Sequence, residues 1–411
     1  MRIAVVGSGV AGSVAAYRLA ERHEVTLFEA EDRLGGHVHT VEVGAEGRRL
    51  AVDTGFIVCN EWTYPGFLAL LAELGVPTQE STMSFSVSCA RTGLEYNGHT
   101  LNTLFAQRRN LFKPSFLRML RAIVRFNREG QEWLAKGTGE PTLAEWLVAG
   151  RYPRELVEHY VHPMAAAIWS AATDQVLEMP LRFFLRFFAN HGMLSIDRRP
   201  TWRVVKGGSF LYMEALHKRS KAKVCKGARV ERVVRAGSEV ELRVGGESPR
   251  FDHVVLATHG DQALAVLSDA TSLEKEVLGA FATVANTAIL HTDTKIMPRA
   301  KRAWAAWNYH LPAEPSELAT VTYDMNTLQS LPAQTRFLVT LNRTAAIDPQ
   351  KILRRMVYRH PVYTNAAVRA QARWAEIDGK HRVSFCGAYW RNGFHEDGLQ
   401  SALAVVAGLT R

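Results

Sequence analysis

Three glycines near the start of the chain have the spacing of a dinucleotide-binding turn. They are Gly7, Gly9 and Gly12. In such a turn the first glycine permits a tight bend, the second lets the backbone approach a pyrophosphate, and the third allows close helix packing. Glu29 follows Gly7 by twenty-two residues, the separation at which an acidic side chain accepts hydrogen bonds from ribose hydroxyls. We therefore predict that a diphosphate binds at the N-terminus of a helix beginning at Val10.

A cationic segment with paired glycines follows this unit directly. Arg33 is followed by Gly35 and Gly36. A cation beside a diphosphate neutralises its charge, and paired glycines indicate close approach of the backbone to a ligand. The segment is thus expected to continue the dinucleotide site.

This Arg-x-Gly-Gly element resembles that of the amine oxidase, phytoene desaturase and protoporphyrinogen oxidase superfamily of flavoproteins. Further segments that resemble motifs of this superfamily follow in the same order along the whole chain. They are Val52-Asp53-Thr54-Gly55-Phe56, Val205-Lys206-Gly207-Gly208-Ser209, Leu256-Ala257-Thr258, Phe385-Cys386-Gly387 and the segment from Gly393 to Leu399. The resemblance implies an FAD-dependent oxidoreductase. It also implies non-covalent FAD, since Cys386 is expected to pack in a strand rather than to tether the flavin.

The glycine turn and the resemblance together give a set of expected FAD-binding residues. They are Gly7, Gly9, Val10, Ala11, Gly12, Glu29, Ala30, Arg33, Gly35, Gly36, His37, Thr54, Gly55, Phe56, Val230, Ala257, Thr258, Gly387, Asp397, Gly398 and Leu399. Two positions depart from the family pattern: His259 replaces a usual glycine, and Ala388 replaces an acidic residue that binds the ribityl chain. We expect Glu396 or Asp397 to supply that missing contact.

Histidines are the candidates for proton transfer, because the pKa of imidazole lies near neutrality. His191 in the segment Phe-Ala-Asn-His-Gly is the favoured candidate, and His162, His291 and Tyr309 are the others. His395 is a further histidine to consider, and Asn190 and Trp390 lie nearby in the same motifs. Most single histidines are structural or exposed, so each of these side chains has an alternative role in packing.

The elements that must position these residues form two kinds of unit. Apolar strands at 2–6 and 23–28 flank a helix at 10–22, and further strands are expected at 228–235, 239–244, 251–257 and 381–386, with a last helix from about Leu399. We predict an α/β fold with a discontinuous, Rossmann-type (glutathione-reductase-like) FAD-binding domain at 1–75, 201–268 and 381–411. An α+β substrate domain is expected at 76–200 and 269–380, with strands at 287–291, 319–323 and 336–342.

The inserted domain bears on the substrate. The segments His162–Ser170, Phe187–Leu194, Trp202–Ser209, Trp304–Tyr309 and His360–Tyr363 resemble a bacterial branch often encoded beside cyclopropane fatty acid synthase. This resemblance implies dehydrogenation (desaturation) or another oxidation of a lipid acyl chain, with such a methyltransferase as a partner. An amine or polyamine oxidase is the alternative enzyme, although the strand at 285–291 lacks the lysine that many amine oxidases place near the flavin. A third hypothesis is that the chain is a non-catalytic, flavin-binding subunit of a lipid-modifying methyltransferase.

Residues 102–126 alternate large apolar side chains with arginine and lysine. A basic amphipathic stretch of this kind suits an anionic membrane surface, and equally a core-facing helix with a solvated basic face. The aromatic pairs Phe183-Phe184 and Phe187-Phe188 have helical spacing, which favours core packing over a substrate tunnel.

Composition sets the broad limits. The chain has 411 residues, 47% hydrophobic residues and a net charge of +10, as expected of a two-domain globular protein with anionic partners. No nucleic-acid-binding module is recognisable, and four scattered cysteines lack metal-ligand spacing, so we expect neither nucleic acid nor metal as a ligand. The first strand begins at Arg2, and no apolar run reaches the ~18 residues of a membrane span. We expect a cytoplasmic protein that can contact a membrane from that side.

Overall fold

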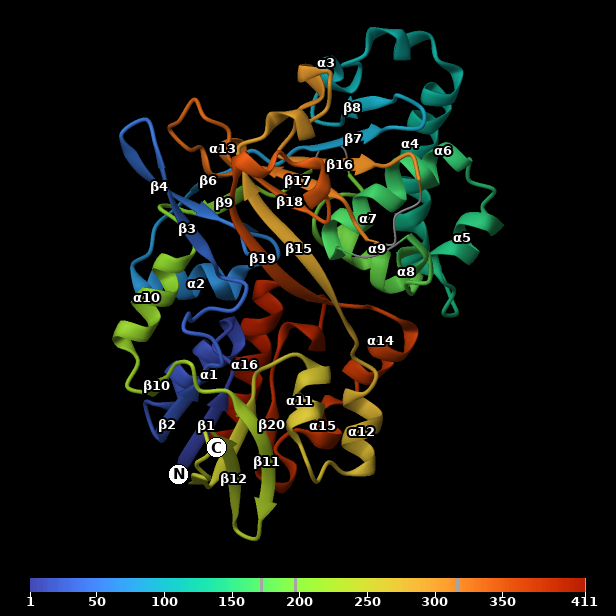
Figure 1. Ribbon diagram of the computed structural model, residues 1–411. Coiled ribbons are helices and arrows are strands. Elements are labelled where there is room, and N and C mark those ends of the chain that lie inside the picture. The colour runs from blue at the N-terminus through green and yellow to red at the C-terminus, as the bar shows by residue number, and fades with distance from the viewer. Residues whose placement is uncertain (171–172, 196–197, 315–317, 411) are drawn as a thin grey trace.

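The computed structural model of the chain describes residues 1–170, 173–195, 198–314 and 318–410 (Figure 1). A five-stranded sheet forms the lower part of the molecule in this view, and all of its neighbouring strands are parallel. Its order is β10 (Lys223–Cys225), β2 (Glu24–Phe28), β1 (Arg2–Val6), β14 (His253–Leu256) and β20 (Val383–Phe385). The central strand β1 leads into the glycine turn.

The two faces of this sheet pack against different layers, because successive side chains of a strand point to opposite sides. Ile3 and Val5 share an apolar core with one set of helices: α1 (Val10–Leu19), α2 (Pro65–Leu74), α10 (Phe210–Arg219) and α16 (His395–Leu409). Ala4 and Val6 share another core with an antiparallel sheet and shorter helices. These are β11 (Val230–Ala236), β12 (Glu239–Val244), β13 (Arg250–Phe251), α11 (Gly260–Val266), α12 (Ser272–Leu278), α14 (Asn365–Gln371) and α15 (Trp374–Ile377). The layers form the expected Rossmann-type α/β arrangement.

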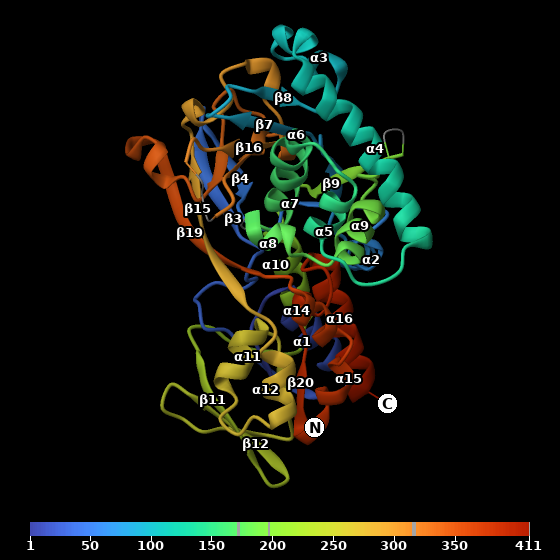
Figure 2. The same cartoon turned by 90° about the vertical axis from the view of Figure 1, so that its right-hand side faces the viewer.

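A seven-stranded sheet dominates the other half of the molecule (Figures 1 and 2). Its order is β19 (Ile352–Pro361), β15 (Thr283–His291), β18 (Leu338–Leu341), β17 (Val321–Asp324), β16 (Trp307–Leu311), β7 (Phe85–Cys89) and β8 (Glu95–Asn97). Only β16 and β7 pair in parallel among these strands. The mixed composition of this half agrees with the predicted α+β domain.

Helices cover one side of this sheet and share its core. They are α4 (Pro114–Lys136), α5 (Leu143–Ala149), α6 (Arg154–Leu156), α7 (His162–Trp169), α8 (Thr173–Leu177) and α9 (Leu181–Asn190). Phe184 and Phe188 of α9 are fully buried in this core, as the aromatic spacing predicted. Phe183 and Phe187 of the same stripe point elsewhere: Phe183 stacks on Tyr363, and Phe187 reaches a cavity described below.

Small strands connect the two halves. The hairpin β3 (Thr40–Ala45) and β4 (Arg48–Asp53) stands beside a short sheet of β5 (Val58–Asn60), β9 (Trp202–Val205) and β6 (Thr78–Glu80). Val43 and Val52 of the hairpin belong to the same apolar core as α9. The hairpin belongs to the segment expected in the FAD-binding domain, but it packs against the core of the other half. The limits of the two domains therefore stay a prediction.

Most expected elements are present, with shifted ends. Helix α1 ends at Leu19 rather than at residue 22, and the strand expected at 251–257 is divided into β13 and β14. Helix α16 begins at His395, earlier than the expected Leu399, because the Asp397 carboxylate accepts a hydrogen bond from the N–H of Phe394 and caps the new start. Gly398 lies inside this helix, where a Cβ atom would approach Val10 to 2.7 Å. The glycine allows α16 to pack closely against α1.

The basic stretch at 102–126 is not one helix. It contains α3 (Leu101–Leu104), a 3₁₀ turn η1 (Arg108–Phe112) and the first half of α4, which begins at Pro114. Proline is favoured at the first position of a helix because its missing N–H would have no partner there. Within the described residues, no helix is both long and apolar enough to cross a membrane.

Candidate active site

A cavity of about 800 Å³ runs from the glycine turn between the two halves to the seven-stranded sheet. This volume lies in the range of sites that hold small molecules and cofactors. Residues of the glycine turn line one end, and aromatic side chains line the other.

The glycine turn has the geometry expected of a pyrophosphate site. A Cβ atom on Gly12 would stand 1.8 Å from the carbonyl oxygen of Gly7, so the third glycine is required by close packing. A Cβ atom on Gly9 would meet no protein atom within 4 Å, although Gly9 lines the cavity. Gly9 thus leaves room that protein atoms do not fill, at the start of α1, where N–H groups favour an anion.

Glu29 is held in place beside this turn. Its carboxylate accepts hydrogen bonds from the N–H and hydroxyl of Ser8 at 2.9 and 2.6 Å and from the N–H of Glu31 at 2.9 Å. Ser8 in turn accepts one from the N–H of Gly35 at 3.1 Å. These bonds tie the acidic side chain, the turn and the paired glycines together at the cavity wall.

The structure places most of the expected FAD-binding residues on the cavity wall. These are Gly7, Gly9, Val10, Ala11, Glu29, Ala30, Gly35, Gly36, His37, Thr54, Gly55, Phe56, Val230, Ala257, Thr258 and Gly387. Five others lie behind it: Gly12, Arg33, Asp397, Gly398 and Leu399. Gly12 and Gly398 act through packing, as their close neighbours show.

Arg33 differs from its expected role beside the pyrophosphate. Its guanidinium donates to the carbonyl of Val38 at 3.0 Å and pairs with Glu31 at 3.1 Å. In this arrangement the arginine stabilises the loop that carries Gly35 and Gly36, rather than lining the cavity.

The acidic residues expected to replace the contact missing at Ala388 have other partners. Glu396 accepts hydrogen bonds from the N–H groups of Gly66 and Phe67 at 3.0 and 2.8 Å, which caps the start of α2. Asp397 caps α16 through Phe394. Neither carboxylate lines the cavity, so that expectation is not met in this structure. His259, the other departure, has ordinary extended backbone angles and precedes α11.

Aromatic and imidazole rings surround the middle of the cavity. Phe56 stacks on His395 with ring centroids 3.7 Å apart, and the Tyr212 hydroxyl lies 2.5 Å from Nε2 of His395. Burial lowers the pKa of His395 to about 3, so this ring is neutral at physiological pH. The pair forms a fixed, uncharged surface at the start of α16.

Three histidines on the cavity wall, His37, His259 and His360, form a second group of rings. The His37 ring lies 5.3 Å from that of His360 and 6.1 Å from that of His259. Burial is the main reason that the pKa of all three is lowered, and for His360 it falls to about 4. In the part of the chain that is described, no group of three or more His, Cys, Asp or Glu side chains is arranged to hold a metal ion.

Four polar atoms of residues on the cavity wall are buried and lack a hydrogen-bond partner among the described residues. They are Nε2 of His37, Nε1 of Trp307 and the hydroxyls of Tyr363 and Tyr389. Buried polar atoms in folded proteins are otherwise almost always paired. Together with the open space at Gly9, they fit a wall that a polar, extended cofactor such as FAD would complete.

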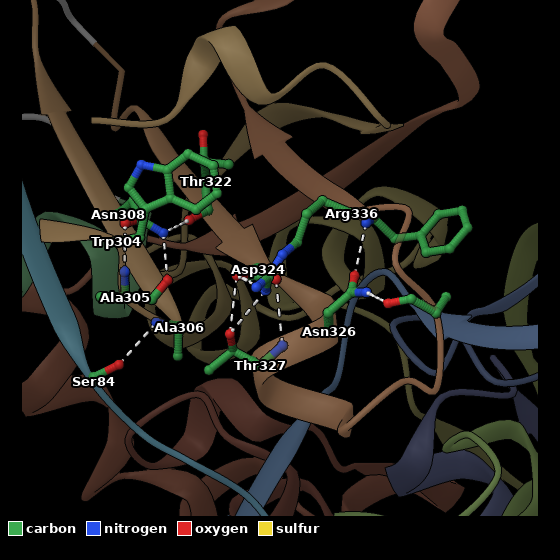
Figure 3. Close-up of polar contacts among 12 residues, drawn as sticks. Ser84, Trp304, Ala305, Ala306, Asn308, Thr322, Asp324, Asn326, Thr327 and Arg336 are labelled. Carbon is green, nitrogen blue, oxygen red and sulfur yellow. Dashed lines mark hydrogen bonds and ion pairs between the residues drawn. The ribbon is translucent and has the colours of Figure 1, made fainter. Parts of the chain in front are cut away.

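A polar network fixes the inner end of the cavity (Figure 3). The Asn308 side chain bonds to the N–H and carbonyl of Ala305, and the Ser84 hydroxyl accepts from the N–H of Ala306 at 2.9 Å. These bonds hold the peptide on either side of Trp307, whose ring meets that of Tyr323 edge to face at 5.0 Å. Trp307, Tyr323 and Ser84 all line the cavity.

Of the four residues favoured for catalysis (His191, His162, His291 and Tyr309), only His191 lines the cavity, as does the further candidate His395. Its Nδ1 faces the carbonyl of Phe187 at 2.9 Å, which assigns the proton to Nδ1 and leaves Nε2 free to accept. Nε2 lies 3.3 Å from the Thr63 hydroxyl. Burial lowers the pKa of His191 to about 4, so the ring is neutral near pH 7. Its stacking on Phe187, at 3.9 Å, fixes its orientation.

The other three candidates lie behind the wall. His291 is fully buried in β15, where Nε2 contacts Thr340 at 2.7 Å and Nδ1 accepts from the N–H of Asp293 at 3.0 Å. His162 and Tyr309 meet each other edge to face at 5.9 Å, both buried. Packing and hydrogen bonding account for these positions, so we do not assign the three residues to the reaction.

The wall also contains residues that the sequence did not identify as site residues. Tyr358 and His360 come from β19, and Trp202 comes from β9. Tyr358 bonds to the Thr54 hydroxyl at 2.8 Å and to His39 at 3.0 Å, which ties β19 to the turn after β4. Trp202 and His360 begin two of the segments that resemble the bacterial branch, and alternation in β19 is the signal that could have indicated Tyr358.

The charges on the wall are unevenly distributed. Among the described residues, the only acidic side chains that line the cavity are Glu29 and Glu31, both at the dinucleotide end, and no lysine lines it. The inner end is built from Met83, Phe85, Met164, Ile168, Trp307 and similar apolar or aromatic side chains. Arg199 also lines the cavity and forms no ion pair with any residue that the structure describes. None of the four cysteines contributes to the described wall.

Comparisons with known proteins agree with this geometry. The family model described as flavin containing amine oxidoreductase matches residues 10–336. A 55-residue stretch is 51% identical to the flavin-dependent L-tryptophan oxidase of Lentzea aerocolonigenes, covering 13% of this chain and 12% of that one. A 182-residue stretch is 30% identical to the coproporphyrinogen III oxidase of Mycobacterium tuberculosis, covering 41% and 38%. The match thus spans less than two fifths of the length of these curated relatives.

Solved structures share the whole fold at low identity. Cyclohexylamine oxidase from Brevibacterium oxydans superposes with a TM-score of 0.69 and 18% identity, over 100% of this chain and 99% of that one. The CLA-producing fatty acid isomerase from P. acnes superposes with a TM-score of 0.70 and 14% identity, over the same shares. Both confirm the α/β, Rossmann-type fold.

Proposed function

The chain belongs to the flavin-containing amine oxidoreductase family, and we propose that it oxidises a lipid acyl chain. Membership makes it an FAD-dependent oxidoreductase. The fold does not select the substrate, because an amine oxidase and a fatty acid isomerase share it equally well. The residues of the inner cavity must therefore distinguish an amine substrate from an acyl chain.

The absence of acidic residues from the inner wall, in the described part of the chain, is the observation that supports this proposal. A protonated amine in a dry site needs a carboxylate or a comparable group to replace water, since an unpaired buried charge is costly. Glu29 and Glu31 are at the opposite end of the cavity. An uncharged alkyl chain needs only apolar contacts, and Met83, Met164 and Ile168 provide these. Arg199 is placed to meet an anionic end of the substrate.

The chain's own residues would bind and orient the substrate and handle its proton. FAD, when bound, supplies the acceptor for the hydride. The apolar wall around Trp307 excludes water from the reacting carbon atoms. Nε2 of His191 carries no proton at neutral pH and faces Thr63, so it can accept the proton that an acyl chain loses when a double bond forms.

Replacement of His191 by phenylalanine tests this assignment. The phenyl ring preserves the stacking on Phe187 and removes the proton acceptor, so flavin reduction by a fatty acid should slow about 100-fold or more. The flavin content should stay unchanged. Because the pKa of His191 is lowered to about 4 by burial, the wild-type rate should be constant from pH 6 to 9 and fall only toward pH 4. Stopped-flow absorbance of the flavin measures these rates.

His310→Gln is the matched control for that substitution. His310 is a half-buried histidine whose Nδ1 contacts Ser88 at 3.2 Å, away from the cavity wall. Its replacement should leave flavin reduction within about twofold of wild type. Equal losses in both variants would argue against a role for His191 in proton transfer.

Anaerobic titration of the flavin with candidate substrates tests the proposed function. Long-chain fatty acids and lipid extract should bleach the flavin absorbance of the purified protein, whereas primary amines and polyamines should not. Bleaching by amines alone would favour the amine oxidase. No bleaching by either class would favour a flavin-binding subunit without turnover, and would overturn the proposal.

A further inference from the structure

The segment that joins β8 to α4 carries an unusual charge. No acidic residue occurs between Glu95 and Glu129, whereas seven cations do: Arg108, Arg109, Lys113, Arg118, Arg121, Arg125 and Arg128. This one segment therefore contributes +7 to a chain whose net charge is +10. Such a concentration of positive charge favours an anionic surface as a partner.

The same segment exposes large apolar side chains. Phe112 is 87% exposed, Leu101 is 76% exposed and Leu111 is 44% exposed. They lie in α3 and η1, at the end of the molecule farthest from the five-stranded sheet in both views (Figures 1 and 2). Exposed phenylalanine and leucine that alternate with cations are typical of elements that enter the boundary between lipid headgroups and acyl chains.

Several of the cations are available for a partner. Arg118 pairs with Glu155, and Arg125 pairs with Glu129 at 2.8 Å. By contrast, Arg108, Lys113 and Arg121 form no ion pair with any residue in the described ranges of the chain. Such cations strengthen binding to an anionic bilayer through attraction to the lipid phosphates.

The exposed segment is continuous with the cavity wall. Gly98 and His99 line the cavity, and Leu101 follows within three residues. The cavity wall is thus connected to the apolar end of the molecule by one short stretch of chain. An acyl chain leaving a bilayer at Leu101 and Phe112 would have a short path to the site.

We propose that residues 101–121 dock the protein on an anionic lipid membrane, with Leu101, Leu111 and Phe112 inserted among the headgroups and Arg108, Lys113 and Arg121 on lipid phosphates. The docking rests on the charge and exposure of this segment. Its use in delivering an acyl chain rests also on the proposed function.

Co-sedimentation of the flavin-loaded protein with vesicles tests the docking surface. The wild-type protein should pellet with phosphatidylcholine vesicles that contain 30% phosphatidylglycerol and stay in the supernatant with phosphatidylcholine alone. The double variant Leu101→Ser, Phe112→Ser should bind the anionic vesicles at least tenfold more weakly. Arg121→Glu should also weaken binding, with a loss that shrinks in high salt because salt screens the attraction.

Val148→Ser is the matched control, since Val148 is 77% exposed on α5, outside the segment. It should bind as the wild type does. Failure of the wild type to bind anionic vesicles, or equal losses in Val148→Ser and the double variant, would overturn the docking surface. Flavin bleaching by detergent-dispersed fatty acid is scored separately. Bleaching without vesicle binding would overturn only the docking, and vesicle binding without bleaching would overturn only the proposed function.

Discussion

Replacement of Gly9 by valine is expected to abolish flavin binding while the apoprotein keeps its fold. The backbone of Gly9 has φ −60° and ψ 178°, angles that any residue can adopt, and a side chain there would meet no protein atom within 4 Å. The space it would fill is the one through which the backbone approaches a pyrophosphate. The cost of the substitution therefore falls on the bound cofactor and not on the folded chain.

The expected loss of affinity is large. We expect FAD to bind at least about 100-fold more weakly, which corresponds to about 3 kcal/mol. Fluorescence quenching of FAD titrated with apoprotein measures the affinity. The apoproteins should unfold at the same temperature within a few degrees, whereas the wild type alone should gain stability when FAD is added.

Gly44→Val provides the control. Gly44 lies in β3, and a Cβ atom there would also meet nothing within 4 Å, but Gly44 does not line the cavity. This variant should bind FAD as the wild type does. Gly9→Val protein that retains a full complement of yellow flavin would show that the cofactor does not approach the glycine turn.

The dinucleotide end of the site could be predicted from sequence because its residues are close together along the chain. Two strands, one turn and one helix place Gly7, Gly9 and Glu29, so spacing alone determines their geometry. Short-range rules apply there because each glycine has a single steric role. Local sequence also indicated four of the five strands of the five-stranded sheet, whereas β10 (Lys223–Cys225) was not expected.

The inner end could not be predicted in the same way. His191 lies on the cavity wall because α9 ends beside Thr63, more than a hundred residues earlier in the chain. His291 belongs to an equally apolar segment, and only the pairing of β15 with β18 makes it a structural residue. No local pattern distinguishes the two histidines. Their roles are decided by tertiary packing.

Two acidic residues are a second example of side chains whose roles the local sequence does not determine. Glu396 and Asp397 stand where a contact with the ribityl chain was expected, and both carboxylates instead cap helices. Asp397 caps its own helix, α16, whereas Glu396 caps α2, which lies more than three hundred residues earlier in the chain. Spacing within a motif cannot show which partner a carboxylate takes. Asp53, which precedes the cavity-lining turn at Thr54, is a more consequential case.

Replacement of Asp53 by alanine is expected to destabilise the protein strongly. Asp53 is fully buried and accepts hydrogen bonds from the N–H and hydroxyl of Ser209, the hydroxyl of Thr40 and the amide of Gln329, at 2.6 to 3.0 Å. Its loss leaves these donors unsatisfied. We expect a decrease in the free energy of unfolding of about 3 kcal/mol at pH 7.5.

The effect should depend on pH in a defined direction. Burial raises the pKa of Asp53 from 3.8 to about 6. Between pH 4 and 6 the folded protein therefore holds a proton that the unfolded chain has released, so the stability that Asp53 contributes falls as pH rises. The shift of about two pKa units corresponds to about 3 kcal/mol. The loss caused by Asp53→Ala should consequently be larger at pH 4.5 than at pH 7.5, by up to that amount.

Urea unfolding of the wild type, Asp53→Ala and Asp53→Asn at the two pH values measures these differences. Groups such as His39, whose pKa burial lowers to about 4, titrate alike in all three proteins and cancel in the comparison. Asparagine keeps an acceptor oxygen for the N–H of Ser209 and cannot titrate, so the difference between the two variants should not change with pH. A loss in Asp53→Ala that is equal at both pH values would show that the carboxyl titrates normally. Asp53 would then be exposed to water in solution, and the cavity-lining turn at Thr54 would lack its buried support.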